Sequence, residues 1–251
     1  MADSDLIYGI HAVQHALRNF PERVLEVWLH IDNKGHKGGG GKLIEIQTLA
    51  ESLGISYQLV PRKSLDKMSN DERHQGVVLR QRQAKPKDES DLLDIVKNSN
   101  GVLLLILDGV QDPHNLGACL RTADAAGADA VVIPASRGVS MTPTVRKVAS
   151  GAADSVPLIE VRNLARTLKE IQDEGVWLIG TSDQATQTIY DQDLKGSIGL
   201  VMGSEDKGIR RLTTEYCDHL VQIPMAGVVE SLNVSVASGV CLYEAVRQRL
   251  K

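Results

Sequence analysis

The second half of the chain alternates short apolar runs with helix-like patterns. The apolar runs lie at residues 102–107, 130–133, 176–180, 198–202 and 220–223. Runs of this kind, without polar alternation, are typical of strands that are buried on both faces of a sheet. Helical patterns lie at residues 116–126, 143–150, 164–174, 207–217 and 234–249. This alternation predicts an α/β fold, with a mostly parallel sheet covered on both sides by helices.

The first 82 residues show a smaller α/β pattern. Helices are predicted at residues 10–20 and 42–53, and strands at residues 24–31, 57–60 and 76–82. Residues 83–100 then change to a charged, proline-containing composition, with a helical pattern around residues 92–97. We therefore predict three parts: an N-terminal domain at residues 1–82, a linker at residues 83–100 and a second domain at residues 101–251.

Composition narrows the class of protein. The chain has 251 residues, 42% of them hydrophobic, which is enough for a sizeable core. Its formal net charge is −4, so a nucleic-acid partner would have to meet a local basic surface. Aromatic residues make up 3% of the chain, which disfavours recognition of many stacked bases.

Cysteine and histidine usage and the absence of long apolar runs disfavour further classes. The three cysteines form no CxxC pair and the seven histidines form no HExxH motif, so we expect no metal. The sequence contains no run of about 18 apolar residues, so no membrane-spanning helix is predicted. The acidic N-terminus carries no apolar signal sequence. We expect no membrane partner and a reducing, cytoplasmic location.

A glycine-rich tract at residues 34–42 does not match the usual nucleotide-binding motifs. It lacks the Gly and Ser or Thr positions of a Walker loop, and no G-x-G-x-x-G follows any predicted strand. Two interpretations stay open. The tract is a mobile connection between a strand and a helix, or a basic loop whose Lys34, Lys37 and Lys42 contact RNA phosphates.

Three polar segments follow predicted strands, at the edge where ligands bind in open α/β sheets. Each has a purely structural explanation. Asn115 and Ser231 are suitable helix N-caps, and Glu205 suits the first turn of a helix. The alternative is one functional site assembled from all three segments. In that site Gly117 allows another segment to approach, and Gly203 lets a ligand reach the backbone.

Taken together, the three segments resemble the signature motifs of the SpoU (TrmH-type) RNA 2′-O-ribose methyltransferases of the SPOUT superfamily. The motifs are Asn115-x-Gly117-x-x-x-Arg121-Thr-Ala-x-Ala-x-Gly127, Met202-Gly203-x-Glu205-x-x-Gly208, and Ile223-Pro-Met with Ser231-Leu-Asn-Val-Ser-Val-Ala237. Their order and spacing agree over residues 102–249. Residues 7–13 and His74-Gln75-Gly76 are similar to the substrate-binding domain of members that methylate large-subunit rRNA.

The resemblance implies a fold, an activity and partners. The N-terminal domain is expected to be L30e-like, and the second to be a SPOUT α/β domain with a deep trefoil knot. The implied activity is S-adenosylmethionine-dependent methylation of a ribose 2′-hydroxyl in RNA. The expected target is a guanosine in the peptidyl-transferase-region loop of 23S rRNA.

The resemblance also implies a homodimer with the active site at its interface. The last helix offers an apolar surface for this contact, unless the same residues pack within their own domain. The residues on this surface are Val236, Val240, Tyr243 and Val246.

The same resemblance implies roles for individual residues. Three would hold the cofactor, largely through backbone groups: Gly203, Ile223 and Leu232. Four would orient the acceptor ribose or the catalytic arginine: Asn115, Glu205, Ser231 and Asn233. Arg121 would lie at the acceptor ribose. Because a guanidinium effectively stays protonated, we interpret Arg121 as an electrostatic clamp on the phosphate and developing alkoxide rather than as the base.

Two other functions are compatible with the motifs. One is a tRNA 2′-O-methyltransferase of the same superfamily, which the L30e-like domain disfavours. The other is a non-catalytic RNA-binding protein that kept the fold, which the intact Arg121, Glu205 and Asn233 disfavour.

Overall fold

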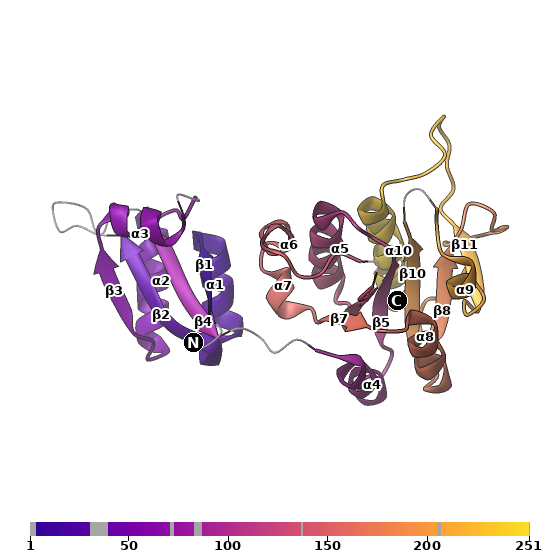
Figure 1. Cartoon of the computed structure of the whole chain (residues 1–251), viewed down its shortest axis with the longest axis horizontal. Helices are drawn as coiled ribbons and strands as arrows, with labels where there is room; N and C mark the ends of the chain where they lie inside the picture. Colours follow the sequence, from indigo (N-terminus) through magenta and orange to yellow (C-terminus); the bar gives the residue numbers. More distant parts are fainter. Residues whose placement is uncertain are drawn as a thin grey trace. The chain divides into compact units, whose positions relative to one another are not determined.

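The chain forms two compact units, Met1–Lys85 and Pro86–Lys251 (Figure 1). The structure is a computed structural model that describes residues 4–30, 40–70, 73–82, 87–136, 138–204 and 207–250. Each unit has its own sheet and its own hydrophobic core. The boundary between the units lies in the stretch where the composition of the sequence changes.

In the described residues, the first unit is a four-stranded sheet of order β1-β4-β2-β3. Its strands are β1 (Ser4–Tyr8), β2 (Val24–His30), β3 (Tyr57–Val60) and β4 (Val77–Arg82). β4 is antiparallel to β1 and β2, whereas β2 and β3 are parallel. The first three strands lead into the helices α1 (Ile10–Asn19), α2 (Gly40–Ser52) and α3 (Arg62–Met68), and a 3₁₀ turn, η1 (Pro21–Arg23), precedes β2.

Alternation along β2 explains how both faces of this sheet are covered. Val27 and Leu29 point to one face, where they share a core cluster with residues of α1 and α2. Trp28 points to the other face and packs with Leu65 of α3 and Val78 of β4.

The sequence patterns of the first unit are confirmed for both long helices and for β2, β3 and β4. α1 begins at Ile10 as predicted, and Gly54 follows α2 in the left-handed region (φ 67°). The patterns missed β1, an edge strand with no fully buried residue, and α3, which buries only Leu65. Neither element carries the run of apolar positions that reveals a buried element.

In its described residues, the second unit has a seven-stranded sheet in which every neighbouring pair is parallel. The strand order is β7-β6-β5-β10-β8-β11-β9. The strands are β5 (Leu103–Asp108), β6 (Ala130–Pro134), β7 (Leu158–Val161), β8 (Trp177–Thr181), β9 (Gln187–Thr188), β10 (Ile198–Gly203) and β11 (His219–Gln222). Every residue of β5 is buried, which explains the unbroken apolar run in the sequence.

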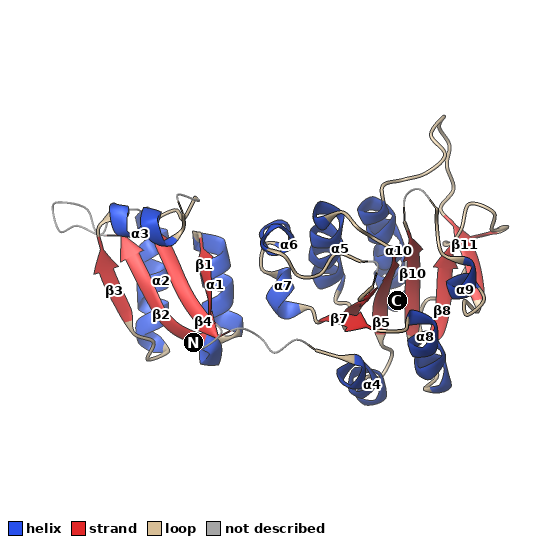
Figure 2. Cartoon of the chain, viewed as in Figure 1, coloured by secondary structure: helices blue, strands red, loops and turns tan. Residues whose placement is uncertain are grey.

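Helices cover both faces of this sheet (Figure 2). One face carries α5 (Pro113–Ala126), α6 (Pro143–Ala149), α7 (Ala152–Ser155) and α10 (Val234–Arg249). The other face carries α4 (Glu89–Asn98) and α8 (Leu164–Asp173), with the short α9 (Arg211–Thr214) against α8. Each face of the sheet has its own hydrophobic cluster: the first cluster lies beneath α5 and α10, and the second beneath α4 and α8. Leu105 of β5 points to the first cluster, whereas Leu104 and Ile106 point to the second.

α4 is part of the second unit. Asp88 caps the helix: its Oδ1 accepts from the backbone N–H of Ser90 at 2.9 Å, and its own N–H donates to Asp91 at 2.8 Å. This reciprocal capping box satisfies backbone donors at the helix start. Leu92 and Val96 then pack into the second cluster, beneath α8.

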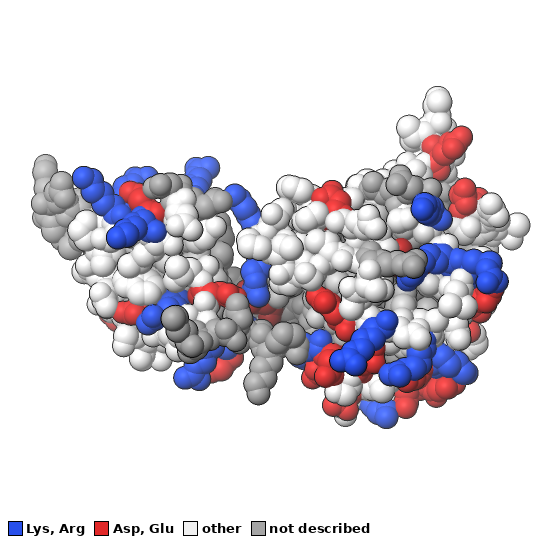
Figure 3. Space-filling view, in the orientation of Figure 1, with Lys and Arg blue, Asp and Glu red and all other residues white. Residues whose placement is uncertain are grey.

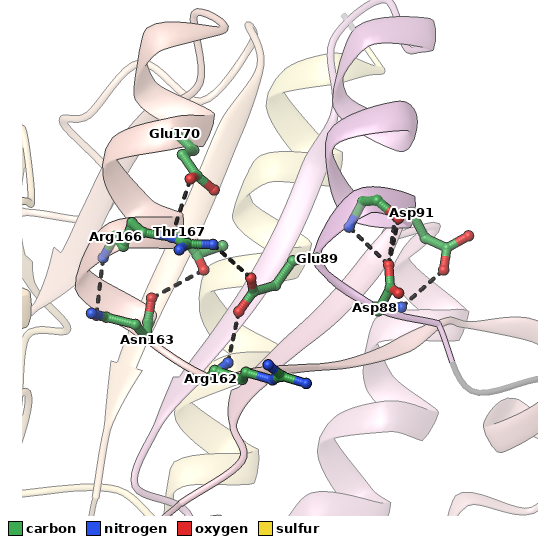
Figure 4. Close-up of polar contacts among 9 residues, drawn as sticks. Asp88, Glu89, Asp91, Arg162, Asn163, Arg166, Thr167 and Glu170 are labelled. Atoms are coloured by element: carbon green, nitrogen blue, oxygen red, sulfur yellow. Dashed lines mark hydrogen bonds and ion pairs between the residues drawn. The ribbon is translucent and has the colours of Figure 1, made fainter.

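Glu89 ties the start of α4 to the start of α8 (Figure 4). One carboxylate oxygen accepts from the backbone N–H of Arg162 at 2.7 Å, and the other from Nη2 of Arg166 at 3.0 Å. The helix that follows the change in composition is therefore held by packing and by polar contacts.

The helix predicted at residues 207–217 is wrong, because only Arg211–Thr214 is helical there. Gly208 lies in the left-handed region (φ 61°) and exchanges two backbone hydrogen bonds with Ser204, at 2.9 and 3.1 Å. This bridge forms a turn where the pattern places the helix start. The patterns also missed β7 and the two-residue β9.

The other predicted helices of the second unit, including α8 and α10, are confirmed. The trefoil knot stays a prediction. In the described part of the chain, no helix has both the length and the apolar character needed to cross a membrane.

Candidate active site

The carboxyl ends of β5, β10 and β11 lie at one edge of the parallel sheet. Gly203 at the end of β10 is in register with Asp108 at the end of β5. The first motif follows β5, the second begins within β10, and the third follows β11. Because parallel strands direct their carboxyl ends to the same side, all three motifs leave the sheet at the edge where such folds bind ligands.

The first motif lies in α5, and the N-cap of that helix is Asp112. Its side chain accepts from the backbone N–H of His114 at 3.0 Å, and Pro113 takes the first helical position. The prediction that Asn115 is the N-cap is therefore wrong. Because the helix already begins at Pro113, the Asn115 side chain is free of the capping role. Arg121 lies further along the same helix and is exposed.

Gly117 of the first motif is required by helix packing. A Cβ atom at this position would lie 2.6 Å from Cβ of Val148 and 3.0 Å from the carbonyl oxygen of Val145, both in α6. The expected close approach of another segment is thus made by α6.

The third motif contains the N-cap of α10, which is Asn233. Its Oδ1 accepts from the backbone N–H of Ser235 at 3.0 Å. The prediction that Ser231 is the N-cap is wrong, because Asn233 provides the acceptor directly at the helix start. The Nδ2 of Asn233 also donates to Oδ1 of Asn115 at 2.9 Å. This hydrogen bond joins the third motif to the first.

Gly203 of the second motif has a structural requirement of its own. A Cβ atom there would overlap the backbone of Gly208 and Ile209, which crosses the end of β10. The chain's own backbone therefore occupies that side of Gly203. Its role in cofactor binding stays a prediction. Glu205 lies outside the described residues, so its predicted role also stays a prediction.

A buried ion pair joins the end of β5 to the segment after Gly203, and the sequence patterns did not single it out. Asp108 is 1% exposed. Nε of Arg210 donates to its Oδ1 at 2.5 Å, and the backbone N–H of Arg210 donates to its Oδ2 at 3.1 Å. A signal for it is present in the sequence. Asp108 ends an otherwise apolar strand, where a charge without a partner would be costly.

Residues 224–232 can present neutral backbone groups to a ligand. Within the described part of the chain, none of their backbone groups bonds to another backbone group. Ile223, just before them, is partly buried against the first cluster and anchors the start of the segment. Uncharged donors and acceptors suit an adenine edge and ribose hydroxyls, so this segment fits S-adenosylmethionine.

The cysteines provide no nucleophile at neutral pH. Burial raises the pKa of Cys119 to about 11, and the pKa values of Cys217 and Cys241 to about 12. The reactive form of cysteine is the thiolate, and these thiols stay protonated. In the described residues, no group of three or more His, Cys, Asp and Glu side chains is arranged to hold a metal ion.

The structure brings together only some of the predicted site residues. Asn115 and Asn233 are hydrogen-bonded, and Leu232, which precedes Asn233 in the sequence, is half-buried. Arg121 and Ser231 are exposed, and their side chains make no hydrogen bond or ion pair among the described residues. An exposed guanidinium at this helix is available to a phosphate or a ribose oxygen.

This architecture is that of an RNA ribose methyltransferase. The crystal structure of an RNA 2′-O ribose methyltransferase matches it with a TM-score of 0.76 and 27% identity, over 100% of this chain and 90% of its own. Residues 102–243 match the SpoU rRNA Methylase family, and residues 6–87 match the RNA 2′-O ribose methyltransferase substrate-binding domain. The chain belongs to the SpoU rRNA methylase family, and the predicted family and α/β fold are confirmed.

Relatives from two bacteria align over nearly the whole chain. The 23S rRNA (guanosine-2′-O-)-methyltransferase RlmB of Haemophilus influenzae is 53% identical over 249 residues, which cover 98% of this chain and 99% of the relative. The protein of the same name in Escherichia coli K12 is 50% identical over 98% of this chain and 99% of its own length.

Proposed function

We propose that this protein methylates the ribose 2′-hydroxyl of a guanosine in 23S rRNA, with S-adenosylmethionine as the methyl donor. The observation that carries this proposal is the identity of 50–53% with enzymes of that name over 98% of the chain, which includes both units. The peptidyl-transferase-region loop is the proposed target within 23S rRNA. A substrate of this kind also favours a cytoplasmic location.

Backbone groups near Gly203, Ile223 and Leu232 would hold the cofactor, which supplies the electrophilic methyl group when it is bound. One feature supports this assignment: within the described part of the chain, the backbone groups of residues 224–232 make no hydrogen bond to another backbone group. The chain's own contribution is to place the acceptor oxygen in line with the methyl group, and positioning of this kind supplies much of the rate.

Arg121 would act on the acceptor side as an electrostatic clamp. Its guanidinium is exposed and stays protonated, so it stabilises negative charge on the phosphate and the developing alkoxide rather than removing the proton. Asn115, Asn233, Ser231 and Glu205 would orient the ribose or the arginine. The hydrogen bond between Asn115 and Asn233 supports a shared positioning role for these two amides.

The first unit would select the RNA. It carries 12 Lys and Arg residues against 10 Asp and Glu, whereas the second unit carries 16 against 22. The net charges are +2 and −6, so the negative charge of the whole molecule comes from the methyltransferase unit. This asymmetry supports a first unit that attracts a polyanion. Lys34 and Lys37 of the glycine-rich tract lie outside the described residues.

The protein would act as a homodimer through α10. Val236 is 52% exposed and Tyr243 is 49% exposed, while Val240 and Val246 are half-buried. Exposed apolar side chains on the last helix support this contact. Its opposite side packs within the unit through residues such as Leu242 and Ala245.

The test is to map ribose methylation in rRNA from cells with and without the gene. Loss of one 2′-O-methylguanosine in 23S rRNA is expected. Purified protein should then restore it on a 23S transcript with S-adenosylmethionine and leave tRNA transcripts unmodified. Methylation of tRNA alone would support the tRNA enzyme, and binding of RNA without methylation of any transcript would support a non-catalytic member.

A further inference from the structure

One edge of the first unit's sheet gathers exposed basic side chains. β1, β2 and β3 end at this edge, β4 begins there, and α1, α2 and α3 follow from it. The exposed basic residues of this edge are Lys42, Arg62, Lys63, Lys67 and Arg73. Figure 3 shows Lys and Arg side chains along this edge, which is uppermost in the view of the first unit. We call these five residues the basic edge.

The buried side of α3 leaves its basic residues on the surface. Leu65 and Met68 pack with Trp28 on the sheet, so Lys63 and Lys67, one turn apart, face solvent together. Residues this exposed contribute little to folding, so their substitution should change the stability of the unit very little. Their grouping is therefore better explained by a ligand than by the fold.

The carboxylate of α3 is already engaged within the unit. Nε2 of the buried His74 lies 2.8 Å from Oδ1 of Asp66. Nδ1 of His74 accepts a hydrogen bond from the backbone N–H of Gly76 at 3.0 Å. The ring hydrogen therefore lies on Nε2, which donates a hydrogen bond to Asp66. Asp66 is thus directed toward the 73–76 turn. The neighbouring Asp71 and Glu72 lie outside the described residues.

The turn before β4 makes this edge rigid. Gln75 has φ 56°, a left-handed conformation that is unfavourable for a residue other than glycine. Its Oε1 accepts from the backbone N–H of Ile10 at the start of α1, at 3.0 Å. The next carbonyl, of Gly76, accepts from the backbone N–H of His30 at the end of β2, at 2.8 Å. A strained turn that fixes two neighbouring connections is typical of a functional surface.

We propose that the basic edge binds the phosphate backbone of the RNA substrate, with Lys63, Lys67 and Arg73 in direct contact. This inference rests on the proposed function and deepens it, because it names the part of the first unit that receives the RNA. Lysine and arginine supply most phosphate contacts in nucleic-acid complexes, and such contacts position the substrate without reading its sequence. The basic edge therefore sets the affinity for RNA, while the methyltransferase unit selects the ribose that reacts.

The test compares two full-length variants that lose the same charge. Lys63→Gln with Lys67→Gln removes two positive charges from the basic edge. Arg18→Gln with Arg82→Gln removes two exposed charges from the opposite edge of the same sheet, where α1 and β4 end. Binding of a 23S transcript is measured over a range of salt concentrations, and methylation is measured at increasing transcript. Arg73→Gln provides a third variant outside α3.

The basic-edge variant should raise the KM for the transcript several-fold and leave kcat and S-adenosylmethionine affinity unchanged. Its log–log salt slope should flatten by about one unit for each lost phosphate contact. Arg73→Gln should act in the same direction, and the control variant should match the wild type. The proposal is overturned if the two double variants have equal salt slopes for transcript binding. It is also overturned if both variants raise the KM for the transcript equally. A wild-type protein that binds the transcript but methylates nothing overturns the proposed function instead, while the slopes still test the edge.

Discussion

Nδ2 of Asn233 donates a hydrogen bond to Oδ1 of Asn115 at 2.9 Å, between residues that are 118 positions apart. The same Asn233 side chain caps α10 through its Oδ1. One amide therefore sets the start of the last helix and holds the side chain that projects from the first turn of α5. The orientation of Asn115 depends on the position of α10.

The two roles of Asn233 can be separated by substitution. Asn115→Ala removes the link and leaves the cap, so its free energy of unfolding should change little. Asn233→Ala removes both and should cost about 1 kcal/mol more. Each variant should lose up to about 100-fold in methyl-transfer kcat/KM, because Asn115→Ala removes the positioning amide and Asn233→Ala removes the group that holds it. Denaturant unfolding and initial rates measure these effects. A double variant with additive losses in activity would show that the two amides act independently.

Arg121 should separate chemistry from cofactor binding. Arg121→Ala should abolish methyl transfer and leave S-adenosylmethionine affinity nearly unchanged, because the arginine is assigned to the acceptor side. Arg121→Lys should also be poorly active, since a point charge does not reproduce the planar guanidinium fork. Calorimetry and single-turnover assays report the two properties. A lysine variant with wild-type activity contradicts the clamp.

α4 should be indispensable for a stable methyltransferase unit. A fragment of residues 86–251 should fold and bind S-adenosylmethionine, because it keeps the capped α4 and its link to α8. A fragment that starts at Ser99 should be much less stable. It exposes the surface covered by Leu92 and Val96, and each side chain contributes about 1.5–3 kcal/mol by burial. Thermal unfolding of the two fragments measures the difference, and equal midpoints contradict it. Neither fragment should methylate 23S rRNA efficiently.

Buried thiols should make the protein sensitive to alkaline pH. Burial raises the pKa of Cys241 from 9.0 to about 12 in the folded chain. The folded state therefore binds this proton more tightly than the unfolded state, so the contribution to stability is present below pH 9 and is lost as the pH rises toward 12. Over this pH range, the unfolding free energy of Cys241→Ala should fall less than that of the wild type. The cavity left by the substitution lowers the unfolding free energy equally at every pH, so it does not change this slope. Parallel slopes for variant and wild type would contradict the assignment.

Elements that bury continuous apolar surface can be recognised from the amino-acid sequence alone. The unbroken run of β5 and the long pattern of α10 are visible because a strand covered on both faces has no polar positions, and a long helix repeats its pattern over several turns. The order of the three motifs also follows from the sequence alone. Through their resemblance to the motifs of a known family, the three segments indicate an RNA methyltransferase.

The residues that cap the helices, and the distant pairs that meet, follow from the folded arrangement of the chain. Asp112 rather than Asn115 caps α5, and Asn233 rather than Ser231 caps α10, because several neighbouring residues offer equivalent acceptors and the backbone path selects one. The sequence shows that the buried Asp108 needs a partner, but only the fold shows that this partner is Arg210. Local patterns report burial and helix periodicity, whereas a hydrogen bond between distant side chains depends on how the strands are ordered in the sheet, which no local pattern contains.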